Sequence, residues 1–188
     1  MAEPEPVSDK RVERSKAKVL AETYRQMAQV GLGGLSIDEV SRVSGVSKTT
    51  IYRHWPSRSA LLIDACSRLG GTPEAPDSGS LKEDLRKLLS YLADQLETAN
   101  WSSVYPSVLD TAERDPEISA MQQSLHQSFM APFVTVLARA TRRNELPSDR
   151  PHDALIAMFV GPLFFRRWFS KERIDEAFID TLVSAIIT

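Results

Sequence analysis

The sequence lacks several features on which common classes of protein depend. It contains a single cysteine, Cys66, so no disulfide bond can form within the chain, as is usual in a reducing compartment. No apolar run approaches the roughly 18 residues of a membrane-spanning helix. Residues 1–9 have no apolar stretch behind a basic segment, so they do not resemble a secretory signal. We therefore expect a cytoplasmic protein without a membrane segment, whose residues 1–9 form a disordered tail.

The residue patterns of catalytic and metal sites are also missing. The three histidines, His54, His126 and His152, are scattered, and no Cys-x-x-Cys or His-x-x-x-His spacing occurs. No Gly-x-Ser-x-Gly nucleophile elbow and no Ser/His/Asp arrangement can be identified. The leucines around Cys66 favour a core position over a redox role. The sequence thus predicts a protein that is not an enzyme and that holds no metal and no cofactor.

Strand-like alternation of β-branched residues is absent, whereas apolar residues recur at helical spacing along nearly the whole chain. Glycine and proline fall between these segments, where they punctuate one helix from the next. The sequence therefore predicts an all-α fold. The expected helices cover about residues 9–30, 37–43, 48–54, 58–65, 81–98, 101–113, 116–143, 151–169 and 175–187, with a stripe of leucines from Leu81 to Leu96.

Residues 71–80 are rich in glycine, proline and serine, and we expect them to link two domains, residues 10–70 and 81–188. The charge balance changes sign near this point. Residues 1–69 hold 11 Lys/Arg and 8 Asp/Glu, whereas residues 70–188 hold 12 and 17. A basic N-terminal part on an acidic body indicates that the first part meets a polyanion, although a charged segment is more often a solvated face.

Two short helices joined by a glycine turn are predicted between Ser36 and Trp55. Ser36 and Glu39 have the spacing of a capping box at the start of the first helix. Ser47 can cap the second helix, and Pro56 ends it because proline constrains the residue before it and lacks an N–H. This organisation is typical of a helix-turn-helix, here within a three-helix N-terminal domain.

The two short helices divide into a buried frame and an outer surface. The expected frame consists of Ile37, Val40, Val43, Val46, Ile51 and Trp55. The outer surface of the second helix then carries Lys48, Thr49, Thr50, Tyr52, Arg53 and His54. Cations, hydroxyls and an amphipathic phenol of this kind suit a helix that lies in the major groove of DNA.

Several residues in and around these helices match a known pattern. They are Val19-Leu20, Met27, Gly31, Leu35-Ser36, Val40-Ser41, the run from Val43 to Trp55, Ser57 and Ala60-Leu61-Leu62. Over about residues 16–68 the chain resembles the tetracycline-repressor (TetR) family of bacterial regulators. That family commonly has alanine at the positions of Glu22, Ser41 and Ser44, and phenylalanine at those of Met27 and Trp55. Looser similarity to one type of TetR ligand domain occurs at Glu113–Glu117, Gly161–Leu163 and Asp175–Phe178.

The resemblance implies an all-helical homodimer, joined through the last two long helices (about residues 151–188), that binds operator DNA and a small-molecule effector. Its DNA contacts would be Ser47, Lys48, Thr49, Tyr52, Arg53 and His54, with Thr50 on the same surface. Of these, Lys48, Thr49 and Arg53 are the best placed to reach base edges. Ser36 and Arg58 lie near helix N-termini, where free N–H groups and the helix dipole favour a phosphate.

Some of these residues have plainer interpretations. Ser36 and Ser47 can cap their helices without touching DNA. The ring of Tyr52 can pack inward while its hydroxyl reaches the surface.

Aromatic residues gather in the second domain. Those expected to line an apolar effector cavity are Trp101, Tyr105, Phe129, Phe133, Phe159, Phe164 and Trp168. Pro132 and the Gly161-Pro162 pair favour a cavity, because kinks keep helices from closing tightly. For any single aromatic residue, a place in the core or the dimer seam is the alternative. The range 151–169 is apolar on more than one side, which predicts burial against both its own domain and a partner subunit.

The sequence thus predicts a sequence-specific DNA-binding transcriptional regulator, most simply a repressor that a small molecule releases from its operator. An enzyme on a helical scaffold would need a catalytic constellation that we do not find. The remaining alternative is a helical small-molecule-binding protein or interaction module that does not bind DNA. The basic, polar surface from Lys48 to Arg58 favours DNA.

Overall fold

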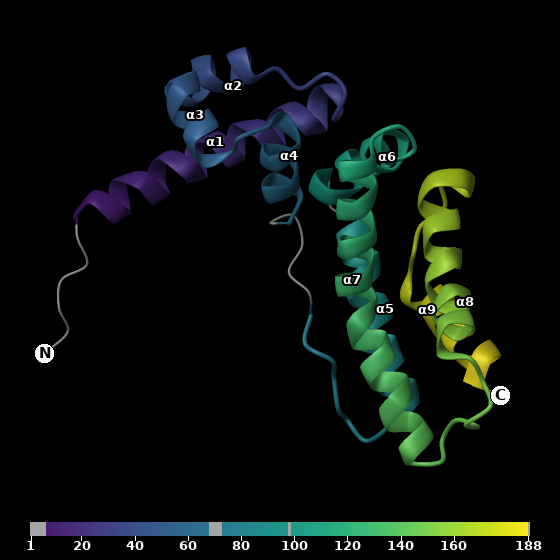
Figure 1. Ribbon diagram of the computed structural model, residues 1–188. Coiled ribbons are helices and arrows are strands. Elements are labelled where there is room, and N and C mark those ends of the chain that lie inside the picture. Colours follow the sequence, from purple (N-terminus) through teal and green to yellow (C-terminus); the bar gives the residue numbers. More distant parts are fainter. Residues whose placement is uncertain (1–6, 68–72, 98, 188) are drawn as a thin grey trace, which may run out of the picture. The chain divides into compact units, whose positions relative to one another are not determined.

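The computed structural model describes residues 7–67, 73–97 and 99–187, and all regular structure in these ranges is helical (Figure 1). The predicted all-α fold is therefore confirmed. The chain forms two compact units: the first combines Met1–Leu69 with Ser103–Gln122, and the second combines Gly70–Ser102 with Gln123–Thr188. Residues 103–122 thus belong with the N-terminal helices, although they follow the expected linker. Residues 1–6 of the expected tail and residues 71–72 of the expected linker lie outside the described residues, whereas residues 7–9, also expected in the tail, are the start of α1.

The first unit is built on α1 (Val7–Val30), which contacts α2 (Ile37–Ser44) and α4 (Arg58–Ser67), while α2 contacts α3 (Lys48–His54). Its buried side chains include Val19, Leu20, Met27, Val40, Ile51, Trp55, Leu61 and Leu62. Each large apolar side chain removed from water stabilises the fold by roughly 1.5–3 kcal/mol. The first turns of α1 differ from the rest, because none of residues 10–18 is buried.

Two later segments complete the first unit, most of α6 (Ala99–Ala112) and the start of α7 (Pro116–Arg142). The hydroxyl of Ser107 on α6 accepts a hydrogen bond from the Leu32 N–H at 2.5 Å. The preceding residue, Gly31, has φ +72°, and a Cβ there would lie 2.8 Å from the Ser107 Oγ. Glycine is therefore required at position 31 both by its left-handed backbone and by this close approach.

The second unit consists of α5 (Leu81–Glu97), most of α7, α8 (His152–Phe164), a π-helix η1 (Phe165–Ser170) and α9 (Glu176–Ile187). The predicted leucine stripe of α5 is confirmed, since Leu81, Leu85, Leu88, Leu89, Leu92 and Leu96 are all buried. α5 contacts both α8 and α9. The described part of the linker is also attached to this unit: Asp84 accepts hydrogen bonds from Ser78, and Arg139 donates to the carbonyls of Ala75 and Pro76.

The segment predicted as helical over residues 151–169 is helical, but the helix changes type in its second part. α8 ends at Phe164, and the chain continues as the π-helix η1 until Lys171 adopts a left-handed conformation with φ 59°. Pro162 supplies the physical reason, because it lacks the N–H that would bond to the preceding turn and its ring crowds that turn. Phe165 and Phe169 stack on the outside of η1, with ring centroids 5.8 Å apart. In the part of the chain that the structure describes, no helix is both long and apolar enough to cross a membrane.

Candidate DNA-binding surface and effector groove

The two short helices of the first unit are capped at their beginnings by serine. Ser36 Oγ accepts the Glu39 N–H, and Ser47 Oγ accepts the Thr50 N–H, both at 3.3 Å. Between the helices, Gly45 takes a left-handed conformation with φ 69°. The lengths and ends of α2 and α3 are therefore fixed by their own sequence.

The predicted capping box is only half formed. Glu39 does not reach back to the Ser36 N–H, because its carboxylate pairs with Arg42 at 2.5 Å. The Ser36 N–H instead donates to Oε1 of the buried Gln26, at 3.2 Å. Gln26 in turn donates to Glu22. The start of α2 is thus attached to α1 through side chains on α1 that the sequence pattern did not indicate.

Glu22 departs from the alanine usual in the TetR family, and the structure gives it a specific role. It is buried, and it accepts hydrogen bonds from Arg25 Nε at 2.8 Å and from Gln26 Nε2 at 3.1 Å. The Arg25 guanidinium holds the pKa of the Glu22 carboxyl below its ordinary value, because it stabilises the charged form. A buried carboxylate with these partners is a satisfied ion, and it orients Gln26 toward Ser36.

Two further serines fix the turn between α2 and α3. Ser41 Oγ donates to the Val46 carbonyl at 2.8 Å, and the Val46 N–H donates to Ser44 Oγ at 3.3 Å. Both serines occupy positions where the TetR family commonly has alanine. They give the turn hydrogen bonds that alanine cannot make.

The expected buried frame needs one correction. Val40, Ile51 and Trp55 are buried, and Ile37 and Val46 are half-buried, but Val43 is 46% exposed. At about 100° per residue, Val43 is turned by roughly 90° from the inner face of α2. Ser44, which is half-buried and accepts a hydrogen bond from the Val46 N–H, lies on that face in place of Val43.

The outer side of α3 collects most of the predicted DNA contacts. Ser47, Lys48, Thr49, Tyr52 and Arg53 are exposed, whereas Thr50 and His54 are half-buried. Thr50 Oγ1 lies 3.0 Å from Ser47 Oγ, so it supports the cap. His54 makes an edge contact with the Trp55 ring. Lys48 Nζ pairs with Asp38 of α2 at 2.5 Å, and both side chains are largely exposed to solvent.

Arg58 is engaged by the protein itself. Its guanidinium donates to the carbonyls of Leu32, Gly33 and Leu35, in the loop between α1 and α2. The side chain is half-buried. These bonds satisfy carbonyls that follow the end of α1, so Arg58 fixes the loop.

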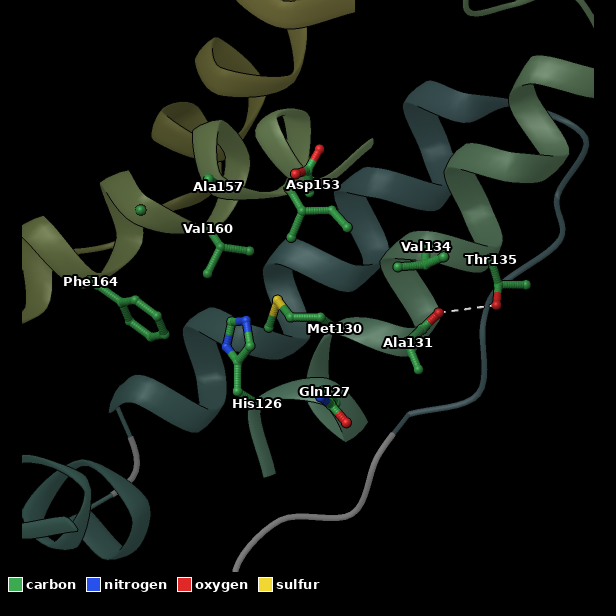
Figure 2. A pocket seen from close by; sticks show the side chains of 12 residues that line it. His126, Gln127, Met130, Ala131, Val134, Thr135, Asp153, Ala157, Val160 and Phe164 are labelled. Atoms are coloured by element: carbon green, nitrogen blue, oxygen red, sulfur yellow. Dashed lines mark hydrogen bonds between the residues drawn. The ribbon is translucent and has the colours of Figure 1, made fainter. Parts of the chain in front are cut away.

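A groove of about 710 Å³ lies between α7 and α8 in the second unit. Figure 2 shows Met130 of α7 and Val160 of α8 directed toward the space between the helices, with His126 and Phe164 beside them. Aliphatic and small residues make most of the wall, and Asp153, Gln127, Thr135 and His126 add polar groups. A groove of this size and composition suits an apolar small molecule that carries a few polar atoms.

Few of the aromatic residues predicted for the cavity line this groove. Of the seven, Phe164 does so. Phe133 and Phe159 are buried in the core, Phe129 and Trp168 are half-buried, and Tyr105 belongs to the first unit. The side chain of Trp101 lies outside the described residues. The groove is also lined by four residues that the sequence did not indicate, Met130, Val134, Ile156 and Val160. Their helical spacing is visible in the sequence, but such spacing does not distinguish a groove from a core.

Cys66 is buried, and burial raises the pKa of its thiol to about 12. It is therefore protonated at neutral pH and is a core residue, as the sequence predicted. Among the described residues, no group of histidine, cysteine and carboxylate side chains could hold a metal ion.

Comparison with known proteins extends over nearly the whole chain. Residues 19–65 match the model of bacterial regulatory proteins of the tetR family, and residues 75–186 match the model of the tetracyclin repressor-like C-terminal domain. The DNA-binding transcriptional repressor TetR of Mycobacteroides abscessus is 29% identical, and the match covers 94% of each chain. An uncharacterized HTH-type transcriptional regulator of Mycobacterium tuberculosis is 27% identical, over 98% of this chain and 89% of its own.

A solved structure agrees with these relatives. The crystal structure of the TetR family transcription regulator SCO0332 superposes with a TM-score of 0.70 at 26% identity, covering 92% of this chain and 96% of that one. The resemblance seen in residues 16–68 is thereby confirmed and extended to the C-terminal half. The chain belongs to the TetR family of bacterial regulatory proteins, and it is a DNA-binding transcriptional regulator.

Proposed function

We propose that this regulator is a homodimeric repressor in the cytoplasm, which binds operator DNA through α3 of each subunit and is released by a small apolar effector. The exposed polar face of α3 carries the proposal. Lys48, Thr49, Tyr52 and Arg53 project from a helix with a serine cap at its start and the buried Ile51 on its inner side. A short rigid helix with such a face suits base readout in the major groove.

We divide the residues of this surface by the part of the DNA that each is expected to contact. Lys48, Thr49 and Arg53 are assigned to base edges, and Tyr52 and His54 to the phosphate backbone. The pair between Lys48 and Asp38 does not oppose this assignment, because an exposed ion pair contributes little and DNA can replace Asp38 as the partner. Ser36, Ser47 and Thr50 are assigned to capping, with phosphate contact by Ser36 and Ser47 as an additional role. Arg58 is assigned to positioning the loop before α2, since its guanidinium donates hydrogen bonds to three carbonyls of that loop.

An exposed apolar stripe on α8 and η1 supports dimerisation through the last helices, about residues 151–188. Met158, Phe165 and Phe169 are 55%, 58% and 77% exposed, and they follow one another at helical spacing together with the exposed Ala154 and Gly161. Contiguous exposed apolar surface is typical of an interface. A two-fold dimer would present two α3 helices to successive major grooves of a pseudo-palindromic operator.

The groove between α7 and α8 is the proposed effector site. One of its walls, α7, also contributes Ile118 and Met121 to the core of the first unit. An effector that alters the position of α7 therefore acts on a helix that both units share. It releases DNA only if it binds the non-binding conformation more tightly.

The test is DNA binding by the full chain. Duplexes are selected from a random-sequence library, and affinities are measured by fluorescence anisotropy. The double variant Lys48→Ala/Tyr52→Ala is expected to lose about 100-fold or more in affinity, because a base contact and a phosphate contact are removed. Light scattering should show an intact dimer, and Lys82→Ala, an exposed lysine of α5, should bind like the wild type. Wild-type affinity in the double variant would show that α3 is not the reading helix.

A further inference from the structure

The first turns of α1 are not explained by packing. Residues 10–18 form regular helix, yet none of them is buried, and the core begins only at Val19. In Figure 1 this purple end of α1 projects beyond α2 and α3. A helical stretch that buries no side chain gains little from tertiary contacts, while ordering it costs conformational entropy. The residue types of this stretch therefore indicate which kind of partner it can bind.

One side of this stretch forms a cleft with the turn between α2 and α3. The cleft has a volume of about 510 Å³, and it is lined by Lys10, Arg11, Arg14, Ser15 and Lys18 of α1 and by Ser44, Gly45 and Val46 of the turn. Gly45 contributes no side chain, and the space where its Cβ would lie is open. A bulky group can therefore approach the backbone of the turn.

The cleft is strongly basic. None of its lining residues is acidic, and Arg11, Arg14 and Lys18 make no ion pair within the part of the chain that the structure describes. The nearby Glu13 pairs with Lys16 at 3.1 Å, and at about 100° per residue Lys16 lies on the opposite side of α1 from the cleft. Several cations in one concave site concentrate positive potential there and favour a polyanion.

The position of the cleft identifies the polyanion. Its turn residues lead directly into Ser47 and α3, so a group held in the cleft lies beside the start of the reading helix. We propose that the cleft binds phosphodiester groups of the DNA backbone that flank the bases read by α3. The inference rests on the proposed function, and it lengthens the DNA site by contacts that carry no sequence information.

The test removes two cleft cations from the full chain and compares three variants with the wild type. Arg14→Ala/Lys18→Ala removes charge from exposed positions and keeps good helix formers, so it should fold as judged by circular dichroism. Lys16→Ala is the matched control on the other side of α1. Arg14→Lys/Lys18→Arg restores the charge with exchanged side chains. Each protein is titrated with a library-selected duplex, and with the same duplex trimmed at both flanks, over a series of salt concentrations.

The cleft variant is expected to bind the long duplex roughly tenfold or more weakly, and to lower the slope of log affinity against log salt by about two for each bound subunit. Trimming the flanks should weaken the wild type but not the cleft variant. Lys16→Ala and the charge-restoring variant should behave like the wild type. Sequence preference should not change, because phosphate contacts do not read bases.

Each contrary result has one meaning. If the cleft variant binds the long duplex with wild-type affinity and salt slope, the cleft does not hold DNA, while the proposed function stands. If Lys16→Ala weakens binding equally, the effect belongs to general charge and the cleft assignment is overturned. If the wild type selects no duplex at all, the proposed function fails, and the inference fails with it.

Discussion

The two units of the molecule hold their helices in different ways. In the first, polar side chains determine the junctions: serines cap α2 and α3, Ser41 bonds α2 to the turn, and Arg58 gathers the carbonyls of the preceding loop. In the second, α7 and α8 leave a groove between them, and α8 passes into a π-helix. On α5 the core consists mainly of six buried leucines, and Asp84 is the buried polar residue that holds Ser78.

The difference fits the roles that we propose for the two surfaces. Discrimination between bases requires donors and acceptors held within fractions of an ångström, so the reading helix needs fixed ends. A site for an apolar small molecule requires unfilled space between helices, and an effector that releases DNA must favour one arrangement of those helices over another. Specific hydrogen bonds are therefore expected where geometry must not vary, and loose packing where it must.

The largest effect on stability is expected when a larger side chain is placed in the core of the second unit, and a smaller one when it is placed in the groove. Val136 of α7 is fully buried, and Val136→Phe should destabilise the protein by about 1–3 kcal/mol, since overpacking strains a filled core. Val160 of α8 is 5% exposed but lines the groove, so Val160→Phe should change the free energy of unfolding much less. Urea unfolding measures both. In addition, only Val160→Phe should reduce the fluorescence of the bound apolar dye ANS; equal destabilisation by both variants would mean that the groove is packed like the core.

A smaller effect is expected from the polar junctions of the first unit. Arg58→Ala removes hydrogen bonds to three loop carbonyls and should lower stability by about 1–2 kcal/mol. Arg58→Lys keeps the charge but not the forked donors, so it separates two roles. If Arg58 fixes the loop, the lysine variant also loses stability. If its main role is to contact phosphate, the lysine variant keeps both stability and affinity for DNA.

The smallest effect is expected for the stability of the protein at acidic pH, through Glu22. Arg25 lowers the pKa of Glu22 from its ordinary value of 4.5. A carboxyl with a depressed folded pKa stabilises the protein above its unfolded pKa, and this contribution is lost as the pH falls through the folded value. Wild type should therefore lose part of its stability below about pH 4.5 that Glu22→Gln does not lose. Unfolding measured at neutral and acidic pH tests this, with the exposed Glu97→Gln as the control that should follow the wild type.

The helix-turn-helix could be predicted from sequence because local signals specify it. Ser36, Gly45, Ser47 and Pro56 mark the ends of α2 and α3 within a few residues, whatever the rest of the chain does. The inward positions followed from helical spacing, apart from Val43. That error arose because a short helix buries a narrow face, and polar Ser44 occupied a position that apolar periodicity assigns to a valine.

For the second unit, the sequence predicted a helical domain with a core but not the details of its packing. The leucine pattern of α5 predicts a core, but helical spacing does not predict which helix an apolar side chain packs against. Met130 and Val160 line a groove while Phe133 and Phe159 fill the core, a distinction set by the packing of α7 against α8. The attachment of residues 103–122 to the first unit likewise depends on contacts far apart in sequence, such as Ser107 with Leu32.

The serines of the α2–α3 turn also bear on how this protein can be redesigned. Consensus substitution, which installs the commonest residue of a family, stabilises many proteins. At positions 41 and 44 it would introduce alanine, and the Val46 carbonyl and N–H would each lose a hydrogen-bonding partner. The two hydroxyls and the Val46 backbone depend on one another, so this turn should be exchanged between homologues as a whole segment, not one position at a time.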